Sequence, residues 1–302
     1  MRIKKILITG ANGLLGQKLI KHYHHNTDAQ IIATGIKASR LGEGNYTYYT
    51  MDVTSKKEVE RVVSATAPDV IIHTAAMTQV DQCETAPEAC WNLNVTAIDH
   101  LIKTSEKNNC FILHLSTDFI FDGKAGPYKE DDTPAPINHY GKSKLASEEL
   151  LRKSTIRYAI VRTQLVYGVT SNPGRLNIVL WVKKNLEERK KIKVVNDQWR
   201  TPTLAEDLAK GCALLADREV EGIFNISGKD MLSPYNMAVT TADFFNLDDS
   251  LIEEVDGSIF TQPAKRPPKT GFILDKAKEA LGYEPVSFWE SLPILKSQLT
   301  GV

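Results

Sequence analysis

Residues 6–16 read Ile6-Leu-Ile8-Thr-Gly10-Ala-Asn-Gly13-Leu-Leu-Gly16, a short apolar run followed at once by three evenly spaced glycines. The apolar run predicts a buried strand, and the apolar pattern of 14–23 predicts a helix. At such a junction the first glycine permits a tight turn, the second lets backbone approach a pyrophosphate, and the third lets helix and strand pack closely. The helix N-terminus would then face the phosphates. The stretch therefore predicts a dinucleotide-binding turn; the alternative is a glycine-rich turn without a ligand.

The alternation of strand and helix continues through the first half of the chain. It predicts a Rossmann-type α/β fold, in which a doubly wound parallel sheet is covered by helices on both faces. Further strands are expected at 31–33, 46–51, 70–72, 111–115 and 158–161, and further helices at 56–65, 87–106 and 140–152.

The second half of the chain is less regular. Helices are expected at 176–188, 204–215, 234–245 and 287–299, a strand at 223–226 and a proline-rich loop at 261–271. We expect a smaller C-terminal substrate lobe that is interleaved with the first domain. The expected division assigns 1–165 and 192–222 to the dinucleotide-binding domain, and 166–191 and 223–302 to the substrate lobe.

The composition is that of an ordinary soluble globular protein, with 42% hydrophobic and 25% charged residues among 302. Lys+Arg and Asp+Glu both number 37, so the zero net charge predicts neither a nucleic acid nor an acidic membrane as partner. The four cysteines have no zinc-site spacing, and no metal site is expected. With no signal-peptide core and no apolar stretch of membrane-spanning length, we expect a cytoplasmic protein.

The loop after the expected strand 31–33 bears on the choice of cofactor. It reads Thr34-Gly-Ile-Lys37-Ala-Ser39-Arg40 and has no carboxylate. In NAD-binding folds an acid near this position hydrogen-bonds the ribose hydroxyl. Lys37, Ser39 and Arg40 would instead hold a 2′-phosphate, which predicts NADP and leaves NAD possible. The alternative is that these residues are solvated loop side chains.

Tyr140 is the only one of 10 tyrosines that has a lysine, Lys144, four residues later. In a helix this spacing places both side chains on one face. Unit charges ~4 Å apart interact by roughly 4 kcal/mol at an effective dielectric of ~20, so the ammonium would lower the pKa of the phenol by at most about three units. The pair predicts a tyrosine able to transfer protons near neutral pH. The alternative is a solvated pair on a helix surface.

The expected strand 111–115 runs into Ser116-Thr117-Asp118. Ligands of open α/β sheets bind beyond the carboxyl ends of the strands, so a hydroxyl here is suited to bind a substrate carbonyl. Ordinary capping of the strand end is the alternative for Ser116 and Thr117.

Taken together, these residues resemble the extended short-chain dehydrogenase/reductase superfamily, and within it the dTDP-4-dehydrorhamnose reductase family. The string Ser-Thr-Asp-aromatic-x-Phe-Asp-Gly is specific to this family and its near relatives, whereas Tyr-x-x-x-Lys is specific only to the superfamily. The matching pieces cover nearly the whole chain: Gly10 to Gly16, Ala75 to Asp81, Asn94 to Ala97, Ser116 to Gly123, Tyr140 to Lys144, Arg162 to Tyr167, Pro202-Thr203 before Asp207-Leu208, and Arg266-Pro267.

The resemblance implies a role for each matched position. Tyr140 is the general acid, Lys144 lowers its pKa and holds the nicotinamide ribose, and Thr117 polarises the substrate carbonyl. The implied cofactor positions are Gly10, Asn12, Gly13, Leu14, Leu15 and Gly16 in the turn, Asp52 and Val53 near the adenine, and Ala75 and Ala76 along the channel. The implied substrate positions are Thr78, Asp118, Asn177 and Arg266. For the last two, a turn-forming Asn and a solvated loop Arg are the alternatives.

The departures from the family pattern fall on the side of the substrate. Gln164-Leu165 replaces a common Ser-Trp pair, Met77 replaces an aromatic residue, Trp199 stands at a usually small position, and Ser147 replaces a frequent glycine. The implied cofactor site and catalytic set are therefore better matched than the sugar pocket.

The resulting prediction is an NADPH-dependent reductase of a 4-keto nucleotide-sugar, with dTDP-4-dehydro-L-rhamnose giving dTDP-L-rhamnose, and with a homodimer possible. One alternative is a non-catalytic NADP-binding regulatory subunit, as in methionine adenosyltransferase, which resembles the same family. Another is a nucleotide-sugar epimerase or dehydratase. Phe119 weighs against a dehydratase, because these enzymes usually carry a second acid at that position.

The histidines enter none of these hypotheses. His73 and His114 lie in apolar strand runs and are predicted to be hydrogen-bonded core residues. His22, His24 and His25 have no metal-ligand spacing and are predicted to lie at a solvated helix end.

Overall fold

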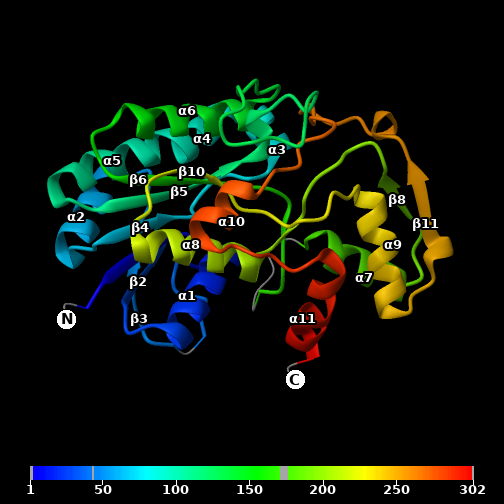
Figure 1. Cartoon of the computed structure of the whole chain (residues 1–302), viewed down its shortest axis with the longest axis horizontal. Coiled ribbons are helices and arrows are strands. Elements are labelled where there is room, and N and C mark those ends of the chain that lie inside the picture. Colours follow the sequence, from blue (N-terminus) through cyan, green and yellow to red (C-terminus); the bar gives the residue numbers. More distant parts are fainter. Residues whose placement is uncertain (1–2, 43, 171–175, 301–302) are drawn as a thin grey trace.

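A seven-stranded parallel sheet forms the centre of the larger lobe (Figure 1). The computed structural model describes residues 3–42, 44–170 and 176–300. The strand order is β10-β6-β5-β4-β1-β2-β3, and each neighbouring pair is parallel. The strands are β1 Lys5–Thr9, β2 Gln30–Gly35, β3 Tyr46–Thr50, β4 Val70–His73, β5 Phe111–Thr117, β6 Tyr158–Thr163 and β10 Gly222–Asn225. The predicted Rossmann-type α/β fold is confirmed.

Helices cover both faces of this sheet, as Figure 1 shows. Successive strand residues point to opposite faces, so Ile6 and Ile8 of β1 join one core cluster and Leu7 joins the other. On the first face lie α1 Leu14–Asn26, α8 Ala205–Arg218 and α10 Asp275–Leu281. On the second face lie α2 Lys56–Thr66, α5 Ala97–Asn108 and α6 His139–Lys153.

The single helix expected at 87–106 is interrupted. The chain forms α3 Val80–Thr85, α4 Pro87–Trp91, a π-helical turn η1 Asn92–Thr96, and then α5. π-Helical turns are rare and occur often at functional sites. The hydrophobic spacing of this stretch fits a helix in either form, so it did not reveal the interruption.

The smaller lobe contains a two-stranded parallel sheet of β8 Ile192–Val195 and β11 Ile252–Val255. Its other elements are α7 Ile178–Glu187, α9 Pro234–Phe245 and α11 Phe288–Thr300, with the short helices η3 Asp249–Leu251 and η4 Gly257–Ile259. Another two-stranded sheet, β7 Val166–Tyr167 and β9 Thr203–Leu204, precedes α8. The strand pairing differs from the expected division into domains. Strand β8 was expected in the dinucleotide-binding domain but pairs with β11 of the smaller lobe, whereas most of β10 was expected in the substrate lobe but β10 joins the large sheet.

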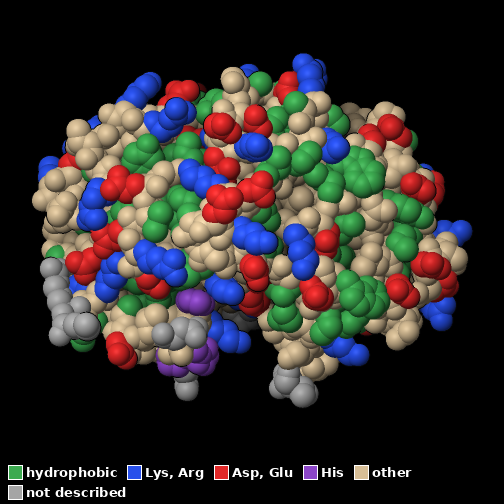
Figure 2. All heavy atoms as spheres, viewed as in Figure 1, with side chains coloured by type: hydrophobic (Ala, Val, Ile, Leu, Met, Phe, Trp, Pro, Cys, Tyr) green, Lys and Arg blue, Asp and Glu red, His purple; other side chains and the backbone are tan. Residues whose placement is uncertain are grey.

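The parallel arrangement brings the carboxyl ends of β1, β4, β5 and β6 to one edge of the sheet. Figure 2 shows basic and acidic side chains interspersed over one face of the molecule, as the zero net charge leads one to expect. In the described part of the chain no helix is long and apolar enough to cross a membrane.

Candidate active site

The glycine turn has the backbone that a dinucleotide needs. Gly10 has φ +64°, and a Cβ there would lie 2.9 Å from the Ala75 nitrogen, while a Cβ on Gly16 would lie 2.6 Å from the Gly10 oxygen. Gly10 is thus required by the close approach of the loop after β4, and Gly16 by the close packing of α1 against the turn that follows β1. Gly13 is exposed, and a Cβ there would meet only the Gly10 oxygen, at 3.1 Å.

The N-terminus of α1 fits a pyrophosphate. The N–H groups of Leu14, Leu15 and Gly16 lie in the first turn of the helix and lack intrahelical acceptors. No side chain caps the helix in their place. Bare N–H groups and the positive end of the helix dipole favour an anion over the exposed Gly13.

The remaining predicted cofactor residues lie along the same sheet edge. Asn12 does not present a free amide, because its Oδ1 accepts from the Arg40 nitrogen at 2.8 Å. Lys37, Ser39 and Arg40 are exposed in the loop after β2. Asp52 and Val53 follow β3, with an Asp52 oxygen held by the Thr54 nitrogen at 2.9 Å. Ala75 and Ala76 are half-buried after β4.

Thr117, Tyr140 and Lys144 come together in a buried corner between β5 and α6. Thr117 ends β5, and Tyr140 and Lys144 lie in the first turns of α6, with exposed fractions of 5%, 9% and 2%. Asn138 caps α6 by accepting from the Gly141 nitrogen at 2.8 Å. The Thr117 hydroxyl donates to Asp118 Oδ1 at 3.1 Å and lies close enough to the Tyr140 phenol to lower its pKa. The predicted constellation is therefore present in the structure.

A close backbone contact fixes the position of this corner. A Cβ on Gly141 would lie 2.0 Å from the Phe119 oxygen, in the short helix η2 Asp118–Ile120. Only glycine lets α6 approach the end of β5 so closely. Phe119 also packs edge-on against Tyr140, with ring centroids 6.0 Å apart.

The predicted net lowering of the Tyr140 pKa is wrong for this structure. Burial raises the pKa of Tyr140 above its ordinary value, and although the nearby Thr117 hydroxyl opposes this, the nearby Asp118 adds to it. Burial also lowers the pKa of Lys144 to about 8, against the opposing charge of Glu148. The sequence estimate counted the attraction between two charges and left out the cost of removing each from water.

Two buried histidines lie beneath Lys144. His114 Nε2 is 3.2 Å from Lys144 Nζ and 2.9 Å from Ser147 Oγ. The His114 ring stacks on His73 at 5.4 Å, and His73 Nδ1 is 2.8 Å from Thr9 Oγ1. Burial lowers the pKa of both imidazoles, that of His73 to about 3, so both are neutral.

The prediction that these histidines are fully hydrogen-bonded is wrong for one nitrogen of each ring. Within the described residues, His73 Nε2 and His114 Nδ1 are buried and have no hydrogen-bond partner. Ser147, which departs from the family pattern, supplies the His114 contact.

Asn94 links two parts of the site through its side chain, a role that its matched sequence position did not reveal. From the π-helical turn its side chain accepts from the Met77 nitrogen at 2.8 Å and donates to the Met77 oxygen at 3.1 Å. It also donates to Ser143 Oγ at 3.0 Å, beside Tyr140 on α6. Asn94 therefore ties the loop after β4 to the catalytic helix. The signal was present, because a buried Asn within an otherwise apolar helix face demands a partner.

The predicted substrate residues differ in their surroundings. The Asp118 carboxylate is buried, accepts from the Thr270 hydroxyl and lies 3.3 Å from Arg200 Nε. Burial raises the pKa of Asp118, and Arg200 opposes that effect. Arg266 pairs with Asp81 at 2.6 Å.

The other two predicted substrate residues lie outside this buried corner. Asn177 caps α7 by accepting from the Leu180 nitrogen, and Thr78 is exposed. Asp118, Arg266 and Asn177 thus have partners within the protein, and their contact with substrate stays a prediction.

The replaced pair 164–165 separates into a buried and an exposed residue. Gln164 is buried and donates to Thr201 Oγ1 at 2.7 Å. Leu165 is 41% exposed and has a left-handed backbone, with φ +39°. It lies two residues after Thr163, which pairs with Thr117 across the sheet. Trp199, 39% exposed, is the other exposed large apolar side chain among the replaced positions. We call Leu165 and Trp199 the apolar rim.

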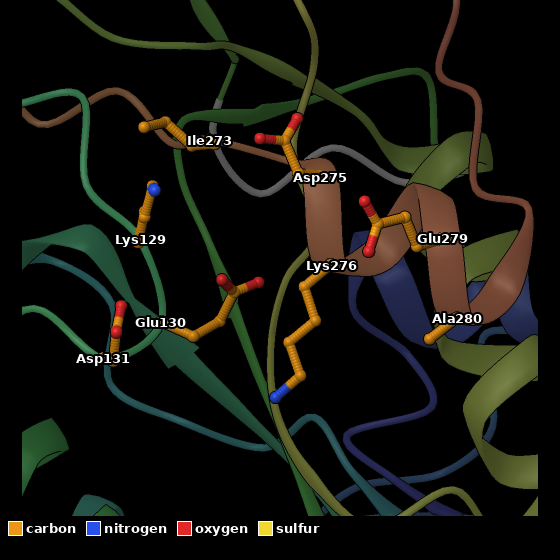
Figure 3. A pocket seen from close by; sticks show the side chains of 8 residues that line it. All are labelled: Lys129, Glu130, Asp131, Ile273, Asp275, Lys276, Glu279 and Ala280. Atoms are coloured by element: carbon orange, nitrogen blue, oxygen red, sulfur yellow. The ribbon is translucent and has the colours of Figure 1, made fainter.

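A surface pocket of about 410 Å³ lies elsewhere, between α10 and the loop 129–131 (Figure 3). Its polar groups already serve the fold, since Glu130 Oε1 accepts from the Asn225 nitrogen and Lys276 Nζ donates to the Ile223 oxygen. It contains none of the residues predicted to act in catalysis.

Known proteins similar to this chain share both its lobes. Residues 4–300 match the family described as RmlD substrate binding domain. The dTDP-4-dehydrorhamnose reductase of Aggregatibacter actinomycetemcomitans is 30% identical over 307 residues, which cover 97% of this chain and 98% of that relative. Methionine adenosyltransferase 2 subunit beta of Pongo abelii is 30% identical over 260 residues, which cover 84% of this chain and 76% of that relative.

A solved structure extends the similarity to three dimensions. The dTDP-4-dehydrorhamnose reductase of Bacillus anthracis in complex with NADP is 28% identical, with a TM-score of 0.83. The matched region covers 98% of this chain and 100% of that chain.

Proposed function

The chain belongs to the family of the RmlD substrate binding domain, and on that premise we propose that it is an NADPH-dependent reductase of a nucleotide sugar. The observation that carries this proposal is the buried corner of Thr117, Tyr140 and Lys144, on the same sheet edge as the uncapped N-terminus of α1. The finer proposal is the substrate, dTDP-4-dehydro-L-rhamnose, which would give dTDP-L-rhamnose. The name of the Aggregatibacter relative supports it.

The residues of the corner have distinct roles in this reaction. When bound, the nicotinamide supplies the hydride that reduces the C4 carbonyl. Thr117 donates a hydrogen bond to the carbonyl oxygen, and Tyr140 transfers its proton to that oxygen as negative charge develops there. Lys144 stabilises the tyrosinate left behind. Gly13 and the N–H groups of Leu14 and Leu15 hold the pyrophosphate.

The electrostatics of the corner suit reduction. Burial raises the pKa of Tyr140, so the phenol keeps its proton at neutral pH until the developing alkoxide, a stronger base, takes it. Lys144, with a pKa of about 8, carries its charge at pH 7. A neutral acid beside a cation favours proton delivery to a developing alkoxide.

The test is an assay of the purified protein with dTDP-4-dehydro-L-rhamnose and either NADPH or NADH, followed by the absorbance of the reduced nicotinamide. We expect oxidation of NADPH that depends on the sugar, with formation of dTDP-L-rhamnose. No oxidation of either cofactor would overturn the substrate assignment, and faster turnover with NADH would overturn the cofactor preference.

Two observations favour the regulatory-subunit alternative. The match to methionine adenosyltransferase 2 subunit beta covers most of this chain, and the apolar rim departs from the reductase pattern. Under this alternative the protein binds NADP, shows no reductase activity and co-purifies in fixed stoichiometry with a catalytic partner. Turnover of the nucleotide sugar by the isolated chain would exclude it.

A further inference from the structure

The phenol of Tyr48, on β3, reaches across β2 to the loop 37–40. Tyr48 pairs with Ala33 of β2, and its hydroxyl donates to the Lys37 oxygen at 2.6 Å. The same hydroxyl accepts from Asn12 Nδ2 at 3.0 Å. A phenol has one proton to donate, so its donor is fully used by the loop backbone.

Asn12 completes this connection from the glycine turn. Its Nδ2 also donates to the Ala38 oxygen at 3.2 Å, and its Oδ1 accepts from the Arg40 nitrogen at 2.8 Å. The backbone at Lys37, Ala38 and Arg40 is therefore held by two side chains that themselves bond to each other. We call Asn12 and Tyr48 the loop clamp.

The clamp depends on a glycine at the end of β2. A Cβ on Gly35 would lie 2.6 Å from the Tyr48 hydroxyl oxygen and 3.3 Å from Asn12 Nδ2. Any other residue at 35 would push the phenol away from the loop. Gly35 has no positive φ, so it is the close approach of the phenol, and not the backbone conformation, that requires glycine here.

The side chains carried by the clamped backbone are free to bind an anion. Lys37, Ser39 and Arg40 are exposed, and over the described ranges neither Lys37 nor Arg40 has a carboxylate within ion-pair distance. No acid follows β2 to bind a ribose hydroxyl. Two unpaired cations on a backbone that is already ordered lose little entropy on binding a phosphate.

We propose that Tyr48 is a positioning residue for the 2′-phosphate of NADPH, and that through the loop clamp it sets the preference for NADPH over NADH. This inference rests on the proposed use of NADPH. Tyr48 does not touch the phosphate; it orders the backbone from which Lys37, Ser39 and Arg40 reach it. Without the clamp, binding must order the loop at the expense of affinity.

The test is calorimetric binding of 2′,5′-ADP and 5′-AMP to the full chain, which separates the 2′-phosphate from the rest of the cofactor. For Tyr48→Phe we expect the Kd of 2′,5′-ADP to rise by about tenfold, as loss of the hydrogen bond from the phenol to the Lys37 oxygen predicts, with 5′-AMP unchanged. Gly35→Ala, which displaces the phenol without removing it, should give the same pattern. In the assay, KM for NADPH should rise while kcat stays constant.

Tyr49→Phe is the matched control. Tyr49 is the next residue of β3 and packs on the opposite face, in the cluster of Leu7. It should bind both nucleotides as the wild type does. Equal binding of 2′,5′-ADP by Tyr48→Phe and wild type would overturn the inference, and so would an equal loss for both nucleotides. The proposed function fails separately, if the wild type itself binds 2′,5′-ADP no more tightly than 5′-AMP.

Discussion

The buried corner lies at the end of β5, and Leu165 of the apolar rim follows β6, the neighbouring strand of the sheet. Corner and rim differ in exposure and in how their side chains are held. In the corner, Thr117, Tyr140 and Lys144 are nearly inaccessible, and each is held by contacts within the protein. At the rim, Leu165 and Trp199 are exposed, and the polar Gln164 between Thr163 and Leu165 is turned inward. The corner matches the reductase pattern residue by residue, whereas the rim departs from it.

Under the proposed function, this difference places the chemistry in the buried corner and substrate specificity at the apolar rim. Proton transfer needs fixed distances and a controlled dielectric, which a buried corner supplies. Substrate choice depends on surfaces that the ligand covers, and exposed apolar side chains can change there without disturbing the corner. Substitutions in the corner should therefore alter kcat, and substitutions at the rim should alter KM.

The largest effect is expected from Tyr140→Phe. Loss of the proton donor should lower kcat by roughly 10²- to 10⁴-fold, because general acid catalysis contributes about that much. NADPH binding, measured by calorimetry, should stay within about twofold, since the phenol is not the main anchor of the cofactor. Tyr158→Phe, which removes a hydroxyl from the start of β6, is the control. Full activity of Tyr140→Phe would show that the corner does not transfer the proton.

Gly141→Ala should damage both stability and activity. The added Cβ would lie 2.0 Å from the Phe119 oxygen, so α6 must move away from η2 and carry Tyr140 with it. We expect a loss of about 1–3 kcal/mol in the free energy of unfolding, measured by denaturant titration, and a fall in kcat. Gly42→Ala is the matched control, because nothing lies within 4 Å of its Cβ position. An unchanged stability for Gly141→Ala would contradict the close approach.

The pH dependence should separate activity from stability. Burial lowers the pKa of Lys144 from 10.5 to about 8, so its charge is lost as pH rises through about 8, and kcat/KM for NADPH should fall there. Between these two values the unfolded chain binds more protons at this lysine, so its contribution to stability rises with pH. Lys144→Met should lack the alkaline limb. A profile that stays flat to pH 10 in the wild type would argue against a catalytic ammonium.

The smallest effect is expected at the rim. Leu165→Trp restores the aromatic residue common in the reductases and should change KM for the nucleotide sugar by only about two- to fivefold, with kcat and NADPH binding unchanged. Leu165→Ala, which removes apolar surface, should shift KM in the opposite direction. A large change in kcat for either variant would mean that the rim and the corner are not independent.

Much of the fold follows from local patterns in the sequence. The apolar runs at 6–8 and 111–115 lie in β1 and β5, and the helix expected at 234–245 begins and ends as predicted, with Ser233 as its cap. The short strands β8 and β11 were missed because Lys193, Glu253 and Glu254 interrupt their apolar runs, whereas the equally short β4 has a continuous apolar run. The π-helical turn was missed because it depends on contacts of Asn94 with Met77 and Ser143.

The sequence alone determined which residues are proposed to carry the chemistry, because spacing places Tyr140 and Lys144 on one helix face and glycines at the end of β1. Tertiary structure decided how those residues behave. It buried the tyrosine and raised its pKa, placed His114 beneath Lys144, joined Asp118 to Arg200, and brought Tyr48 to the loop beside Asn12. The physical reason is that desolvation and hydrogen bonding depend on neighbours distant in sequence, and no local pattern records them.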